Sequence, residues 1–233
     1  MRALPAVLLF ALAVAGCGVG RDFVRPDPAN VRLGKSTTAE IRMAYGAPRT
    51  ERSWTRTESD LKSETMSPFG GAREAGIVSE LYYYYSDRFS PSAAPGVNPS
   101  KSTTFWFVND RLAGYLSSSS FAADPTLFDE AKVASIKPWK WLRADVVAAL
   151  GKPSGALVYP LVSGEDLQVM SYYTFQFDRG AGQTRRRVFH VLVDSIGVVR
   201  DVHYESTTRP IPAAPATSTV PIYVPPPTRS RSR

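Results

Sequence analysis

The residue types that most often perform chemistry are scarce in this chain of 233 residues. It contains one cysteine, Cys17, and two histidines, His190 and His203. A single cysteine excludes an intramolecular disulfide and any metal site built from several cysteines. The two histidines and the carboxylates show no recognisable metal-ligand spacing. We therefore predict that the protein holds neither a metal ion nor a cofactor.

A serine hydrolase is the catalytic alternative to consider. Such a site needs a nucleophile beside a histidine that an acid orients, and the serines at 117–120 lack a Gly-x-Ser-x-Gly elbow. If alternate apolar residues around His190 face the core, the strand register pairs His190 with Asp201 on the outer face. We interpret that pair as structural, with no serine beside it. The sequence thus predicts a protein that is not an enzyme, with a hydrolase as the least favoured alternative.

The N-terminal residues predict export and lipidation at Cys17. Arg2 is a short positive region, and the uncharged apolar run of residues 3–15 is too short to span a bilayer, as is typical of a signal peptide. The run ends in Val-Ala-Gly before Cys17, which resembles the bacterial lipobox. This resemblance implies a signal peptide of residues 1–16 and three acyl chains on Cys17, which hold the mature chain to a membrane. Gly18 in place of aspartate implies the periplasmic face of a Gram-negative outer membrane.

Charge and composition separate two terminal segments from the middle of the chain. The formal charge is +7, but residues 209–233 hold four arginines and no acid, so the middle is nearly neutral. A nucleic-acid-binding domain carries its basic charge on a folded face, and we therefore predict no nucleic-acid partner. Residues 17–30 include Pro26 and Pro28 and are predicted to be a lipidated tether. Residues 209–233 contain seven prolines and are predicted to be a flexible tail rich in proline and arginine.

Between these segments the chain repeats a helix followed by strands. Residues 38–48 align with residues 143–153, and apolar residues at i, i+3 and i+4 predict a short amphipathic helix in each. A glycine in the left-handed position and a proline two residues later end each helix; these are Gly46 and Pro48 in the first copy and Gly151 and Pro153 in the second. Aromatic and β-branched runs that predict strands follow both helices, with hairpin turns at 109–110 and 194–197.

The start of the first helix resembles a known family. From Gly34 the sequence reads Gly-Lys-Ser-Thr-Thr-Ala-Glu-Ile, and Tyr-Gly-Ala-Pro follows at 45–48. This is similar to the signature of the SmpA/OmlA (BamE-like) outer-membrane lipoproteins, and the second copy departs from it at 138–141. The resemblance implies an α+β fold of two BamE-like, β-lactamase-inhibitor-like units at 31–120 and 121–208. Each unit would have one or two short helices packed on a small antiparallel sheet, and the protein would act as a non-enzymatic envelope adaptor.

Two functions from different classes follow from these features. We expect a lipid-anchored scaffold that binds an envelope protein, in outer-membrane assembly or envelope integrity. The alternative is a periplasmic ligand-binding or sensing module that uses the aromatic sheet faces, including the outward pair among Tyr82–Tyr85. Trp139 and Trp141 precede the second helix, and we expect at least one in the core. The other, if exposed, would contact a partner or the membrane interface.

Overall fold

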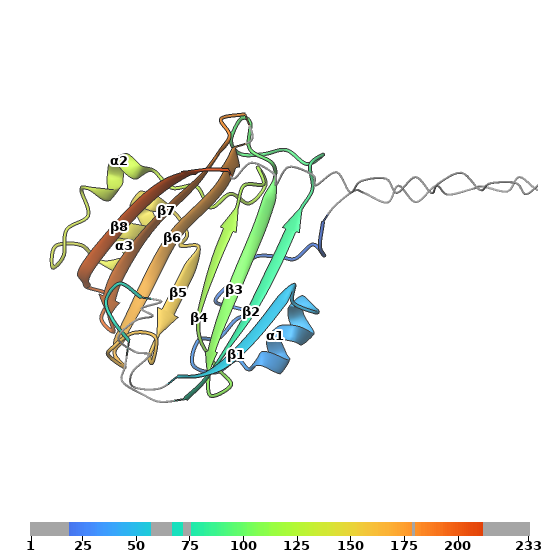
Figure 1. Cartoon of the computed structure of the whole chain (residues 1–233). Coiled ribbons are helices and arrows are strands. Elements are labelled where there is room, and N and C mark those ends of the chain that lie inside the picture. Colours follow the sequence, from blue (N-terminus) through green and yellow to red (C-terminus); the bar gives the residue numbers. More distant parts are fainter. Residues whose placement is uncertain (1–18, 57–66, 72–75, 179, 212–233) are drawn as a thin grey trace, which may run out of the picture.

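The computed structural model describes residues 19–56, 67–71, 76–178 and 180–211. Its main feature is one antiparallel sheet of eight strands in sequence order (Figure 1). The strands are β1 (Thr50–Arg56), β2 (Gly76–Ser86), β3 (Ser100–Val108), β4 (Arg111–Ser119), β5 (Gly155–Val158), β6 (Leu167–Asp178), β7 (Gln183–Asp194) and β8 (Val199–Pro210). The helices among these residues are α1 (Thr38–Tyr45), α2 (Glu130–Val133) and α3 (Arg143–Leu150). None of the helices described is long and apolar enough to cross a membrane.

The predicted α+β fold of two BamE-like units is wrong, because the strands of both halves form one continuous sheet. The halves join where residues 114–116 of β4 pair with residues 155–157 of β5. Gly155 permits this approach, since a Cβ atom there would lie 2.5 Å from the carbonyl oxygen of Tyr115. Local periodicity shows which residues form strands, but it does not show which strand edges pair. The sequence therefore indicated two sets of strands but not the pairing of β4 with β5 that joins them.

The two halves nevertheless share the local geometry that ends their helices. α1 and α3 end before Gly46 and Gly151, whose φ angles are 82° and 81°. The Tyr83 hydroxyl donates to the Gly46 carbonyl at 3.0 Å, and the Tyr172 hydroxyl donates to the Gly151 carbonyl at the same distance. The predicted helix ends are confirmed, and in each half a buried tyrosine from the sheet holds the helix end in place.

The starts of the two helices are also equivalent, which explains where the second copy departs from the motif. The Gly34 N–H donates to the Leu112 carbonyl of β4 at 2.7 Å, and the Trp139 N–H donates to the Val199 carbonyl of β8 at 2.7 Å. Gly34 has a φ of 72° and Trp139 a φ of 65°. The same left-handed backbone position therefore holds glycine in the first half and a bulky residue in the second.

Both long helices cover one face of the sheet, here called the helix face. Ile41 of α1 packs with Leu81 and Phe105, and Val146 of α3 packs with Met170 and Phe189. The other face, here called the groove face, is covered at the end that holds the Asn109 turn, here called the Asn109 end. A third apolar cluster lies there, and its buried residues are Val78, Val108, Ala113, Leu157, Leu161, Val162 and Val169. The opposite end, where β2 ends and β3 begins, is here called the Ser86 end.

The segment from residue 23 to residue 33 is packed on the helix face, unlike the tether expected from the sequence. Phe23 and Val31 are buried in the first apolar cluster. The Arg25 guanidinium donates to both carboxylate oxygens of Asp124, at 2.6 and 2.5 Å. This segment thus belongs to the fold, while residues 17–18 and 212–233 lie outside the described part of the chain.

Candidate functional site

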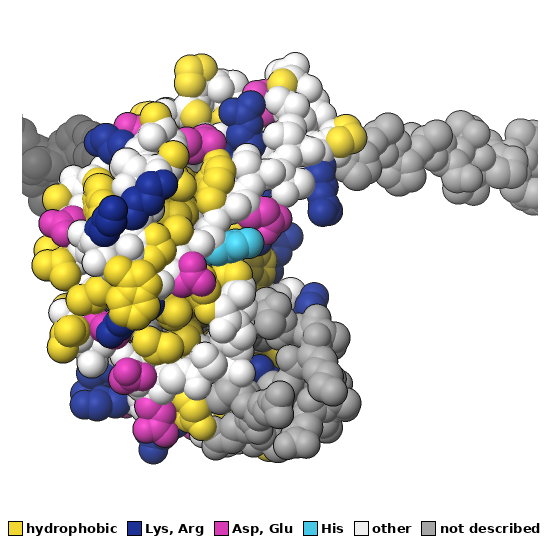
Figure 2. All heavy atoms as spheres, turned by 90° about the vertical axis from the view of Figure 1, so that its left-hand side faces the viewer, with side chains coloured by type: hydrophobic (Ala, Val, Ile, Leu, Met, Phe, Trp, Pro, Cys, Tyr) yellow, Lys and Arg dark blue, Asp and Glu magenta, His cyan; other side chains and the backbone are white. Residues whose placement is uncertain are grey.

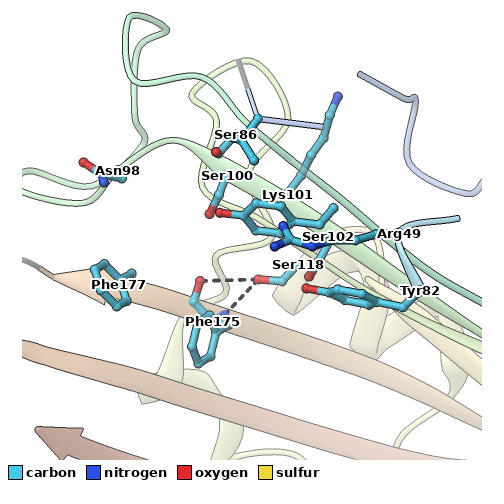
Figure 3. A pocket seen from close by; sticks show the side chains of 12 residues that line it. Arg49, Tyr82, Ser86, Asn98, Ser100, Lys101, Ser102, Ser118, Phe175 and Phe177 are labelled. Carbon is cyan, nitrogen blue, oxygen red and sulfur yellow. Dashed lines mark hydrogen bonds between the residues drawn. The ribbon is translucent and has the colours of Figure 1, made fainter. Parts of the chain in front are cut away.

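A groove of about 580 Å³ lies on the groove face near the Ser86 end. Tyr82 and Tyr84 line it from β2, and Phe175 and Phe177 line it from β6. Figure 3 shows the labelled aromatic side chains on the two sides of the groove, with Arg49 beside them. The full lining consists of Val19, Arg49, Tyr82, Tyr84, Ser86, Asn98, Ser100, Lys101, Ser102, Ser118, Phe175 and Phe177.

The shortness of β5 brings β4 and β6 together at the groove. β5 pairs only with residues 114–116 of β4 and 168–171 of β6, so no strand lies between the remaining parts of these two strands. A serine side chain makes the link instead. Ser118 Oγ accepts the N–H of Phe175 at 2.8 Å and donates to its carbonyl at 3.5 Å (Figure 3). This link fixes Phe175, whose side chain is 40% exposed, in the groove wall.

The groove carries positive charge without a balancing acid. Its lining includes no aspartate or glutamate, and no described carboxylate forms a salt bridge with Arg49. The Arg49 guanidinium carbon lies 4.8 Å from the centroid of the Tyr84 ring. Burial raises the pKa of Tyr82, so this ring stays neutral. The ammonium group of Lys101 is directed elsewhere, to Asp22 at 2.5 Å.

These groups suit a ligand of particular chemistry. Aromatic rings bind flat apolar surfaces, and hydroxyl and amide groups such as those of Ser102 and Asn98 form directional hydrogen bonds. An arginine without a carboxylate partner attracts an anionic group. The groove therefore fits a polar ligand that has one apolar face and a negative charge.

The predicted pairing of His190 with Asp201 is wrong. Val193 pairs with Val199, and a β-bulge between Leu192 and Val193 shifts the register by one further residue, so that His190 lies opposite His203. His190 is only 7% exposed, and its Nδ1 lies 2.9 Å from the hydroxyl oxygen of Ser171. Burial lowers the pKa of His190 to about 4, so the ring is neutral at neutral pH.

The contact between Ser171 and His190 places a hydroxyl beside a histidine, as in a hydrolase, but it lacks an accessible nucleophile and an orienting acid. Ser171 is 0% exposed, so its hydroxyl offers no surface to a substrate. The strand neighbour of His190 is a second histidine rather than an orienting acid. In the described residues no three groups of the His, Cys, Asp and Glu types lie close enough together to hold a metal ion. The contact fits a buried polar pair that satisfies its own hydrogen bonds.

The two tryptophans before α3 have different surroundings, and one of them packs against the core as expected. Trp141 is partly buried against the second apolar cluster, whereas Trp139 is 67% exposed with the Arg200 guanidinium 4.1 Å from its ring centroid. Exposed Leu142 and Ile196 lie beside the same turn. We call Trp139, Leu142 and Ile196 the Trp139 patch. Figure 2, which views the side carrying α2, α3 and β8, shows hydrophobic side chains with basic ones among them.

The remaining residues singled out from the sequence have structural roles or lie outside the described part of the chain. Pro48 and Pro153 follow the two helix ends, and Gly34 occupies the turn before α1. Cys17 lies outside the described residues. Tyr82 and Tyr84 are the outward pair of the tyrosine run, while Tyr83 is buried. Arg49 and Phe175 were not identified as binding residues from the sequence. The alternation of polar and aromatic residues at 173–177 is the pattern that could have indicated Phe175.

Searches against protein-family models, curated proteins and solved structures give no match to this chain. The SmpA/OmlA resemblance therefore rests on the short motif alone and stays a prediction, and the continuous sheet does not have the two-unit arrangement that the resemblance implied.

Proposed function

We propose that this protein is a lipid-anchored component of the bacterial cell envelope that binds a ligand in its groove without catalysing a reaction. The groove is the observation that carries the binding function. Its volume of about 580 Å³ falls within the range of roughly 300–1,000 Å³ that small-ligand sites occupy. The apolar run before Cys17 and the lipobox support the anchor, and Gly18 supports the outer membrane.

Native mass spectrometry of the mature lipoprotein in mild detergent tests this binding function. We expect a bound species of defined mass that is retained on purification. Arg49→Gln removes the charge of the groove, and Phe175→Ser removes one of its aromatic walls, so each variant should lose the species. Ile77→Ser is the control, because Ile77 is exposed and does not line the groove. Absence of any bound species, or equal retention in all variants, would contradict the proposal.

A second candidate function is the protein scaffold expected from the sequence, and the Trp139 patch favours it. Trp139 has a left-handed φ of 65°, which is strained for a bulky residue and costs of order 1–3 kcal/mol. Strained residues of this kind cluster at functional sites. The cations Lys137, Lys140 and Arg143 lie in the same segment, so the patch suits an acidic protein partner. In intact envelopes a protein crosslink at Ile196 that Trp139→Gly abolishes would support this second function.

A further inference from the structure

The chain enters the fold at a fixed place on the sheet. Val19 pairs with Ser86 through two backbone hydrogen bonds, in which its N–H donates at 2.8 Å and its carbonyl accepts at 3.0 Å. Gly20 follows with a φ of 87°, and a Cβ atom there would lie 2.2 Å from the carbonyl oxygen of Tyr84. Glycine is therefore required for this close approach to β2, and it fixes the first described residue at the Ser86 end.

The lipidation site in the proposed function is only two residues before Val19. Two extended residues span at most about 7 Å, so acyl chains on Cys17 would hold the Ser86 end next to the lipid headgroups. Along the strands, the eleven residues of β2 extend for roughly 33 Å at about 3.3 Å per residue. The Asn109 end, with the Trp139 patch, would then be far from that membrane surface.

The loop that follows β2 carries side chains suited to a membrane interface. Phe89 is 70% exposed, and the Arg88 guanidinium carbon lies 4.8 Å from its ring centroid. No described carboxylate forms a salt bridge with Arg88. Asp87 holds the loop in shape, because its carboxylate accepts the Phe89 N–H at 3.0 Å and the Ser90 hydroxyl at 2.8 Å. Exposed phenylalanine inserts at the boundary between headgroups and acyl chains, and basic side chains are attracted to anionic headgroups.

We infer that the Ser86 end is a membrane-docking surface on which Arg88 and Phe89 contact the headgroups of the anchoring bilayer. This inference rests on the proposed lipidation of Cys17. Docking at the Ser86 end gives the protein a fixed orientation, in which the helix face and the groove face are both roughly perpendicular to the membrane plane. Because Val19 and Ser86 also line the groove, the ligand site would open close to the bilayer surface.

Site-specific fluorescence tests this orientation in the full mature lipoprotein. Lipidation uses the only natural thiol, so a cysteine introduced by Phe89→Cys or Ile196→Cys would be labelled alone with an environment-sensitive dye. Residue 196 is 79% exposed at the Asn109 end and is the matched control. The proteins are reconstituted into phosphatidylethanolamine–phosphatidylglycerol vesicles that contain a lipid with a nitroxide on its headgroup. We expect quenching at residue 89 to exceed quenching at residue 196 several-fold.

Two results would overturn the inference, and they are distinguishable. If the mature chain carries acyl mass and floats with the vesicles, but both positions are quenched equally or residue 196 more, the docking surface is wrong and the lipid anchor stands. If intact-mass measurement shows no acyl chains on the mature chain, the proposed anchor fails and the inference fails with it.

Discussion

Replacing the two helix-ending glycines by alanine tests the shared geometry of the two halves. Gly46 has φ and ψ of 82° and −160°, and Gly151 has 81° and −165°. Only glycine enters this backbone region readily, and another residue there costs of order 1–3 kcal/mol. A Cβ atom at Gly151 would meet nothing within 4 Å, so Gly151→Ala isolates the backbone cost. At Gly46 it would lie 2.4 Å from a guanidinium nitrogen of Arg21, a flexible side-chain end that can move.

We expect each substitution to lower the free energy of unfolding by about 1–3 kcal/mol, with the two values within about 1 kcal/mol of each other. For a folded region of this size, each kcal/mol lowers Tm by roughly 2–4 °C. Urea unfolding of a soluble Cys17→Ser form, followed by far-UV circular dichroism, measures the change. Gly180→Ala is the control: Gly180 is exposed and lacks a left-handed φ, so its effect should stay within about 0.5 kcal/mol.

The reasoning is refuted if Gly151→Ala is neutral or stabilising, because the position would then not need glycine. A large loss at one glycine with none at the other would refute the equivalence of the two helix ends. If both substitutions lower the free energy of unfolding no more than the Gly180→Ala control does, alanine is tolerated at positions 46 and 151.

Three further predictions concern pH, targeting and the exposed tryptophan. Burial lowers the pKa of His190 to about 4 in the folded protein, against about 6.5 in the unfolded chain. The unfolded chain therefore takes up the proton first, and the free energy of unfolding should fall by about 3 kcal/mol as the pH drops from 6.5 toward 4. Urea unfolding at several pH values should show a smaller fall for His190→Gln. Cys17→Ser should move the protein from the membrane fraction to the soluble fraction, and a variant that stays membrane-bound and lipidated would contradict the anchor. Trp139→Gly should leave the free energy of unfolding unchanged or raise it by up to about 1 kcal/mol. The reason is that relief of the strained left-handed backbone offsets the lost contact with Arg200. A decrease of more than about 1 kcal/mol would show instead that Trp139 stabilises the fold.

The local elements could be predicted from the sequence because their signals are short-range. Thr37 and Glu40, three residues apart, form a capping box at the start of α1, and the turns at 109–110 and 194–197 join the expected strands. The alternation expected for the tyrosine run is present, because Tyr83 is buried while Tyr82 and Tyr84 line the groove. Each of these features depends on residues within a few positions of one another.

The larger arrangement could not be predicted because it depends on contacts between distant residues. β5 has four residues, too few for a clear alternation, yet it joins the two halves. The turn, which pairs Val193 with Val199, and the bulge that follows each moved the partner of His190 by one residue, from Asp201 to His203. The groove combines Arg49, Tyr82 and Phe175 from separate strands and loops, and no local pattern connects them.

Photo-crosslinking in intact envelopes tests the groove as the binding site most directly. A photoreactive phenylalanine analogue replaces Phe175 in the groove wall, and a second variant carries it at Ile196 in the Trp139 patch. If the groove is the binding site, irradiation will attach a ligand of defined mass at residue 175, and Arg49→Gln in the same chain will reduce the yield. No adduct at residue 175, together with a protein adduct at residue 196, would contradict ligand binding and favour the scaffold.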